Sequence, residues 1–95
     1  MAIIEAIVTL VIKKNQTENK ETSVFATLDP VGRDEFATAG QRGYKAAFKV
    51  EIWFFEYGNE PEIIINDKKY TIYRTYGPRA DGKIELYVAE RTGKS

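Results

Sequence analysis

The chain contains no cysteine and no histidine among its 95 residues. Without cysteine there is no disulfide framework, and no thiolate that could bind a metal or attack a substrate. Without histidine the commonest general base near neutral pH is missing, and so is the usual zinc ligand. These two absences argue against an enzyme, and the sequence predicts neither a cofactor nor a metal site.

The chain also lacks an excess of either charge, because 14 Lys and Arg balance 14 Asp and Glu. A protein that holds nucleic acid by bulk electrostatics needs a clear cationic excess. The apolar N-terminal stretch is broken by Glu5 and is too short to cross a bilayer. It has neither the cationic opening nor the cleavage site of a secretory signal. We therefore expect a small soluble protein, cytoplasmic or bound in an assembly, with no membrane partner.

The length predicts one small domain over residues 1–95. A chain of this size is expected to bury on folding only roughly 60–65% of the surface that it exposes when unfolded, so its core is small. Aromatic residues make up 13% of the chain and β-branched residues are frequent, which favours strands over helices. Six stretches have the composition and alternation of short strands. They are Ala6–Lys14, Thr22–Leu28, Ala46–Phe55, Glu62–Ile65, Lys68–Tyr76 and Lys83–Arg91. We predict an all-β fold, a small antiparallel β-barrel or sandwich of about six strands.

Turn residues separate these stretches. The polar run Asn15–Glu21 is expected to form an exposed hairpin tip. Asn66 and Asp67 tolerate positive φ, so they predict a tight two-residue hairpin. Two further turns are expected at 57–61 and 77–82 because both contain Gly and Pro.

The composition changes after the second predicted strand, where Gly32–Gly43 holds three glycines in twelve positions. Arg33–Ala39 predicts one short helical turn, with acidic residues near its start and Gly40 as a C-cap. Seven residues do not hold a helix alone, so this turn depends on packing. We expect a long loop here, the most mobile part of the chain. From Phe36 to Val50 the only charged residues are Arg42, Lys45 and Lys49, which makes this stretch locally cationic.

The sequence shows no credible active site. Asp34 and Glu35 are adjacent, so they do not converge on one face of a helix. Asp67 and Asp81 lie in predicted turns, where aspartate serves the backbone. The glycines at 40 and 43 lack the lysine of a phosphate-binding loop.

The aromatic residues of the second half of the chain leave three roles open. They can fill a small barrel core with their tyrosine hydroxyls reaching water. They can stack bases beside lysines and arginines, a role that the balanced charge makes the weaker one. They can also form a protein interface, because both faces of Ile52–Phe55 are apolar, with Trp53 and Phe55 as candidates. The residues considered for base stacking are Trp53, Phe55, Tyr70, Tyr73, Tyr76 and Tyr87, with Lys49, Lys68, Lys69 and Arg74 nearby.

The order of these motifs resembles the phage head–tail joining proteins, also called head-completion or stopper proteins. The resemblance covers about three-quarters of the chain, from Val24 to Gly93. The family pattern has a strand, a Pro, a Gly-Arg-acid-Glu-aromatic motif, a long loop, a strand, a short hairpin and a closing strand. The matching stretches are Val24–Pro30, Gly32–Phe36 with Ala39, Phe48–Ile52, Ile63–Ile72 and Gly82–Arg91. Two departures are that Asn15–Ser23 is shorter than the family's first hairpin and that Asn66–Asp67–Lys68 replaces its commoner Asp-Gly-Lys turn.

The resemblance implies a small β-barrel that docks as a homo-oligomeric ring beneath the portal and adaptor after DNA packaging and bridges the head to the tail. In some members of the family, a loop after the second strand closes the channel against DNA leakage. In this chain that channel-gating loop corresponds to residues 32–44, with Arg42 and Lys45 facing the packaged DNA. The matching positions are Gly32, Arg33, Asp34, Glu35, Phe36, Gly40, Gln41, Arg42, Gly43 and Tyr44.

The leading hypothesis is therefore a non-enzymatic structural protein of a tailed phage or prophage. It would act at the head–tail interface of the virion and occupy the host cytoplasm during assembly. One alternative is a neighbouring neck or tail-terminator component of similar size. A second alternative, from another class, is a stand-alone nucleic-acid-binding barrel.

Overall fold

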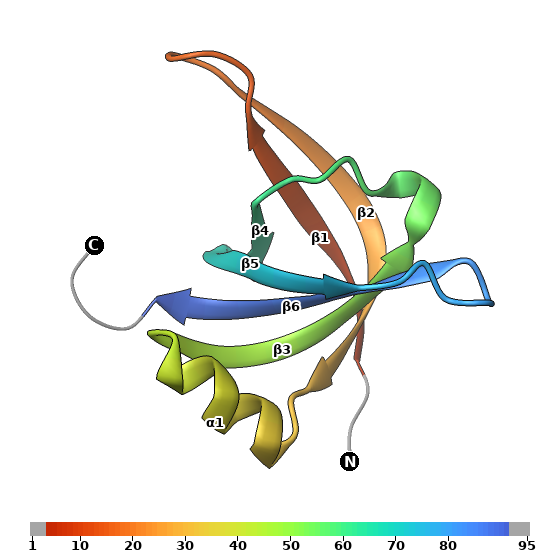
Figure 1. Ribbon diagram of the computed structural model, residues 1–95. Helices are drawn as coiled ribbons and strands as arrows, with labels where there is room; N and C mark the ends of the chain where they lie inside the picture. The colour runs from red at the N-terminus through yellow and green to blue at the C-terminus, as the bar shows by residue number, and fades with distance from the viewer. Residues whose placement is uncertain (1–3, 92–95) are drawn as a thin grey trace.

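The computed structural model describes residues 4–91, which form six strands, one α-helix and one 3-10 turn (Figure 1). The prediction of a mainly β fold is confirmed. In chain order the elements are β1 (Ile4–Lys13), β2 (Asn19–Pro30), α1 (Arg33–Gln41), β3 (Tyr44–Trp53), η1 (Phe54–Glu56), β4 (Glu62–Ile65), β5 (Lys68–Tyr76) and β6 (Lys83–Arg91).

All neighbouring strands are antiparallel, and they follow one another in the order β1-β2-β3-β6-β5-β4. The sheet closes into a small barrel because β1 pairs with β4 as well as with β2. Hairpins join β1 to β2, β4 to β5 and β5 to β6, and β3 pairs with β6 across the whole length of both strands. Closure leaves few unpaired strand edges, which small β proteins otherwise have to protect.

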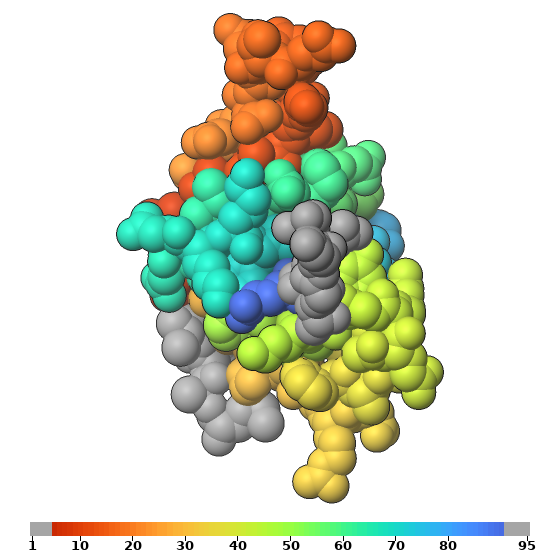
Figure 2. Space-filling view, turned by 90° about the vertical axis from the view of Figure 1, so that its left-hand side faces the viewer, coloured from red at the N-terminus to blue at the C-terminus, as the bar shows by residue number. Residues whose placement is uncertain are grey.

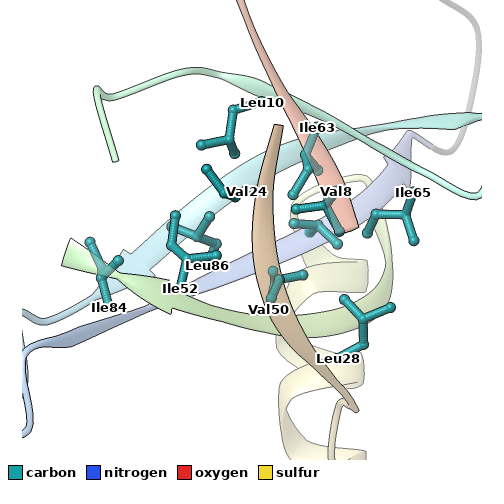
Figure 3. Packing of buried hydrophobic residues seen from close by; sticks show 12 residues of the cluster. Val8, Leu10, Val24, Leu28, Val50, Ile52, Ile63, Ile65, Ile84 and Leu86 are labelled. Carbon is teal, nitrogen blue, oxygen red and sulfur yellow. The ribbon is translucent and has the colours of Figure 1, made fainter. Parts of the chain in front are cut away.

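The core fills the inside of this barrel with buried side chains from β1, β2, β3, β4 and β6, and β5 adds partly buried ones (Figure 3). The predicted alternation places every second residue inward, so that Val8 and Leu10 of β1 face Val50 and Ile52 of β3. Phe48, Tyr70 and Ile72 are partly buried against the same cluster. The cluster consists of Val8, Leu10, Val24, Ala26, Leu28, Val50, Ile52, Ile63, Ile65, Ile84, Leu86 and Val88.

The hairpin between β4 and β5 has the predicted tight turn, because Asn66 and Asp67 have φ angles of 53° and 66°. The first hairpin is longer than predicted. β2 begins at Asn19 rather than at Thr22, and β1 pairs with it up to Lys13. Since β1 pairs with β4 only from Thr9 to Val11, the end of this hairpin stands out from the barrel (Figure 2).

The tip of the first hairpin is closed by an Asx turn. The Oδ1 atom of Asn15 accepts hydrogen bonds from the backbone N–H groups of Thr17 and Glu18, both at 2.9 Å. The polar composition of this segment predicts the exposed tip. It does not predict the strand pairing on either side, because side chains that point to water on both faces carry no alternation.

The segment after β2 is more ordered than a long loop. The expected helical turn is a nine-residue helix, α1, which packs against β3. It continues past Gly40 to Gln41, and Gly43 is the residue with a positive φ, 85°. Gly40 therefore does not cap the helix, and the turn out of α1 uses the left-handed conformation at Gly43.

The end of β3 also differs from the prediction. The strand stops at Trp53, and Phe54–Glu56 form the 3-10 turn η1. The predicted strand runs to Phe55, but the side chain of Phe54 is 44% exposed because the backbone leaves the sheet before it. Across residues 4–91 the structure contains no helix with the length and apolar character needed to span a membrane.

Candidate functional site

Four large apolar side chains face outward over β1, β2 and the end of β3. Ile7 and Phe25 are cross-strand partners on β1 and β2, and they are 70% and 59% exposed. Trp53 and Phe55 stack with their ring centroids 6.3 Å apart, and they are 44% and 81% exposed. We refer to these four residues as the apolar row. A concentration of exposed apolar side chains of this kind is typical of a surface that contacts another protein.

A shallow hollow of about 70 Å³ lies within the apolar row, between β2 and β3. It forms because the two strands pair only from Thr27 to Pro30 on β2 and diverge beyond that point. Phe25 lies on one side of the hollow and Trp53 on the other. Glu5, Glu51 and Lys83 also line it, and Lys83 Nζ lies 5.0 Å from the centre of the Trp53 ring, so the hollow carries charges of both signs.

The negative charge beside the hollow is organised by an arginine from the turn between β5 and β6. Glu51 and Glu85 lie directly opposite each other on β3 and β6, an arrangement that is repulsive without a cation. Arg79 Nη1 lies 3.1 Å from a carboxylate oxygen of Glu51 and 2.6 Å from one of Glu85, and its Nη2 lies 2.6 Å from Asp81. The hydrogen bond that Arg79 donates to Asp81, with those that it donates to both glutamates, raises the pKa of Arg79. This bridge fixes the turn against the barrel.

The pKa values of Glu85 and Tyr87 are set by hydrogen bonds and burial in the cluster around Arg79. Burial would raise the pKa of Glu85, but hydrogen bonds from Arg79 and Tyr87 hold that pKa below its usual value. Burial, together with the hydrogen bond to Glu85, raises the pKa of Tyr87 to about 12. Both groups therefore keep fixed charge states near neutral pH, as expected of a structural network rather than a proton-transfer site.

A second polar cluster holds α1 on the barrel, and we call it the latch. The carboxylate of Glu35 accepts hydrogen bonds from the hydroxyl of Tyr73 and from the guanidinium of Arg74. The guanidinium of Arg74 also lies 3.9 Å from the centre of the Tyr87 ring. Tyr73 stacks on Tyr44 with ring centroids 5.1 Å apart. The hydrogen bonds from Arg74 lower the pKa of Glu35, so this carboxylate is ionised near neutral pH.

The latch depends on an irregularity in β5. Successive residues of a strand normally point to opposite faces, which would turn Tyr73 and Arg74 away from each other. The pairing of β5 with β6 shifts between Ile72 and Arg74, as at a β-bulge. The shift lets two consecutive side chains reach one carboxylate on α1. The sequence carries no local signal of this contact, since Glu35 is 38 and 39 residues away from its two partners.

The predicted channel-gating residues therefore have different surroundings. Gly32 precedes α1, residues 33–41 form it, and Tyr44 begins β3. Arg33, Asp34, Phe36, Gly40, Gln41 and Arg42 are exposed, whereas Glu35 belongs to the latch. The guanidinium of Arg42 lies 5.9 Å from the centre of the Tyr44 ring.

The cationic stretch of the sequence is partly balanced in space. Lys49 lies 3.7 Å from Asp29 and 3.9 Å from Glu51. Lys45 is exposed, and its cross-strand neighbour on β6 is Glu90. The other cations considered for base stacking also have acidic partners, because Lys68 pairs with Glu90, Lys69 with Glu62 and Arg74 with Glu35. These pairs weaken the attraction of the barrel for a phosphate backbone.

The aromatic residues divide between buried and exposed positions. Tyr70 packs against the core, and Tyr73 and Tyr87 are partly buried in the polar clusters. Trp53, Phe55 and Tyr76 are exposed. Phe25 lies on the face of β2 opposite the buried Val24 and Ala26, and the alternation gives no reason to connect it with Trp53. Within the described residues, 4–91, no three Asp or Glu side chains are grouped so that they could hold a metal ion.

Comparisons of the chain with known protein families, with curated protein sequences and with solved structures find no match.

Proposed function

We propose that the chain is a structural subunit of a phage head–tail connector, which forms a ring beneath the portal and adaptor and bridges the head to the tail. The observation that carries the proposal is the apolar row, four large side chains that face water in the isolated chain. The order of motifs along the sequence supports the phage context. The closed barrel supports it as well, because it provides a rigid block to which neighbouring proteins can bind.

In this proposal the barrel functions by fitting its surface against neighbouring proteins of the connector. The apolar row is a contact surface, and the ion pairs along its border set the orientation of the partner. The α1 segment is the part that faces the channel, with Arg42 and Lys45 directed at phosphates of the packaged DNA. A few cations repeated around a ring suffice for this role even though the net charge of the chain is zero.

The connector role is tested with particles from a phage strain that lacks this gene, complemented with the full-length protein. We expect particles without it to lack tails or to lose their DNA, and the wild-type chain to restore tailed, DNA-filled virions in electron micrographs. The Phe55→Ser chain is expected to restore at least tenfold fewer tailed virions than the wild-type chain, because Phe55 is the most exposed member of the apolar row. Tyr76→Ser, which removes an exposed aromatic side chain outside the row, serves as the matched control.

Normal tailed virions in the absence of the protein would overturn the proposal. Salt-dependent binding of the isolated chain to single-stranded nucleic acid, without binding to connector-bearing capsids, would favour the stand-alone nucleic-acid barrel instead. The channel-facing role of α1 is tested separately with Arg42→Ala and Lys45→Ala particles. Unchanged DNA retention and ejection in those particles would remove the gating role and leave the connector role in place.

A further inference from the structure

We propose that the open edge of β2 accepts an extended segment of a partner protein, which pairs with residues 20–26 as an added strand. This inference rests on the proposed function in that it takes the partner to be the connector proteins on which the chain docks. Three observations carry it. They are an unpaired backbone, a groove that runs beside it, and a composition without the residues that protect such an edge.

The unpaired backbone is the edge of β2 that faces away from β1. β2 pairs with β1 from Asn19 to Leu28, but with β3 only from Thr27 to Pro30. Within residues 4–91, the backbone of residues 20–26 has no backbone hydrogen bond to any segment except β1. Successive residues of a strand direct their N–H and C=O groups to alternate edges, so about half of these residues offer a donor and an acceptor to a further strand.

A groove of about 360 Å³ runs along this edge. β2 forms one wall between Lys20 and Val24, and residues between 55 and 60 form the other. The second wall exists because the chain leaves the sheet after Trp53, and Figure 1 shows η1 beside β2 above the point where β3 ends. The hollow begins at the next residue of β2, Phe25. A strand added to β2 would lie about 4.8 Å from it, between these two walls.

The groove fits one extended chain rather than the edge of a second barrel. The open edge of β2 in another copy carries β1 beyond it, whereas the wall at residues 55–60 occupies the place that this further strand would need. An extended segment that enters alone meets no such obstacle. It gains main-chain hydrogen bonds from the edge and specificity from the side chains along its path, as in other complexes formed by strand addition.

The side chains along the path indicate what the segment carries. Phe25 and Phe55 present aromatic rings to it, so we expect β-branched or aromatic residues at alternate positions. Lys20, Glu56 and Glu60 line the groove, so it contains charges of both signs. Backbone pairing and apolar contact therefore select the segment more than net charge does.

The composition of β2 leaves this edge open to pairing. Edge strands of natural proteins are usually protected by charged side chains, proline or bulges. Residues 22–27 are Thr-Ser-Val-Phe-Ala-Thr, without a charge, a proline or a glycine, and their pairing with β1 has no shift in register. Lys20 and Glu21 lie only at the outer end of the edge. An edge of this kind is expected where another chain covers it.

The absence of cysteine allows a direct test by disulfide exchange. The probe is the peptide Thr-Val-Thr-Cys-Thr-Val-Thr with blocked ends, offered at millimolar concentration with glutathione to the full chain carrying Ser23→Cys. Ser23 is exposed and lies on the open edge. We expect the ratio of peptide adduct to glutathione adduct to be at least tenfold higher than for Thr9→Cys. Thr9 is the matched control because it lies directly opposite Ser23, with their hydroxyl oxygens 3.5 Å apart, but between β2 and β4.

Two further measurements identify strand pairing as the cause. A peptide N-methylated at the two residues after its cysteine keeps its side chains but loses one donor on each edge, so its ratio should fall at least tenfold. In the peptide adduct of Ser23→Cys, amide exchange at alternate residues between 20 and 26 should be at least tenfold slower than in the glutathione adduct. Equal ratios for Ser23→Cys and Thr9→Cys, or no loss on N-methylation, would overturn strand addition. A Ser23→Cys homodimer that forms in preference to the peptide adduct would show that two β2 edges pair, and would overturn the single extended segment.

The outcomes on particles separate this inference from the proposed function. We expect the peptide adduct of Ser23→Cys to attach to connector-bearing capsids at least tenfold less than its glutathione adduct, because the added strand already occupies the edge. Equal attachment of the two adducts would overturn the use of this edge by the connector, while the connector role stands. Selective formation of the peptide adduct by a chain that does not attach to such capsids in any form would support strand addition and overturn the connector role.

Discussion

The barrel and the helix α1 are held in place by different forces. Twelve apolar side chains from five of the six strands form the barrel core, and several of them are fully buried. On α1 the only buried side chain is Ala39, and the latch from Glu35 to Tyr73 and Arg74 supplies the specific contacts. Burial of apolar surface is insensitive to pH and strengthens in structure-making salts, whereas an ion pair is titratable and screened.

This difference indicates that the two parts respond separately to perturbation. A change in the core is expected to lower the free energy of unfolding of the whole domain, since the barrel folds as one unit. A change in the latch is expected to act locally, because opening of α1 exposes little apolar surface. The segment proposed to face the channel is thus expected to open independently of the barrel.

The largest effect is expected for Leu86→Ala. Leu86 is fully buried on β6 in the middle of the core, and its truncation leaves a cavity. We expect the free energy of unfolding to fall by about 2–5 kcal/mol in urea titrations. Ile7→Ala, a truncation of similar size at a side chain that is 70% exposed, is expected to change it by less than about 0.5 kcal/mol. Equal losses in the two variants would show that the outward face of the barrel is packed against something in the isolated chain.

A smaller and local effect is expected for Glu35→Gln, which keeps the shape of the latch and removes its charge. Arg74 is partly exposed and therefore screened, so we expect a loss of about 1 kcal/mol. Amide hydrogen exchange in α1 should then be roughly fivefold faster, with exchange in the barrel unchanged. Asp34→Asn is the matched control, because Asp34 is in the same turn of the helix and is exposed. Equal acceleration in both variants would assign the effect to the helix dipole rather than to the latch.

The Glu35→Gln variant also tests whether Glu35 is the group that makes the stability of α1 depend on pH. The pKa of Glu35 is lowered in the folded chain, chiefly by the hydrogen bond from Arg74. The stabilisation it gives is therefore fully present above the unfolded-state pKa, about 4.3, and is lost as the pH falls through the lower folded-state value. Exchange protection of α1 in the wild-type chain should decrease from pH 6 to pH 3, and in Glu35→Gln it should change less. Parallel curves for the two proteins would exclude Glu35 as the titrating group.

Much of the barrel could be predicted from the sequence. The alternation of apolar and polar residues located β4, β5 and β6 with their observed bounds, and Asn66–Asp67 identified their tight hairpin. The alternation works because each strand has one buried face, so the side-chain pattern and the backbone period coincide. It failed at the polar start of β2, and at Phe54, where η1 takes the chain out of the sheet.

The surfaces were harder to predict. The apolar character of Trp53 and Phe55 indicated an interface, but the hollow depends on where β2 and β3 diverge, which is a property of the register. The latch depends on a shift in the pairing of β5 that brings Tyr73 and Arg74 to one side. Neither feature follows from residues that are close in sequence. The sequence therefore predicted that this chain has a contact surface more readily than it predicted the shape of that surface.

Effects no larger than that of the latch are expected at two of the turns with positive φ, and they separate the barrel from α1 once more. Asp67 has a φ of 66° in the β4–β5 hairpin, so Asp67→Gly should relieve strain in the barrel. Because glycine also gains entropy in the unfolded chain, we expect a net stabilisation of only about 0.5 kcal/mol in urea titrations. Gly43, with a φ of 85°, follows α1, so Gly43→Ala should cost about 1 kcal/mol and accelerate amide exchange in α1 alone. If Gly43→Ala instead lowered the free energy of unfolding of the barrel, α1 and the barrel would open together, and the helix could not act as a separately released segment.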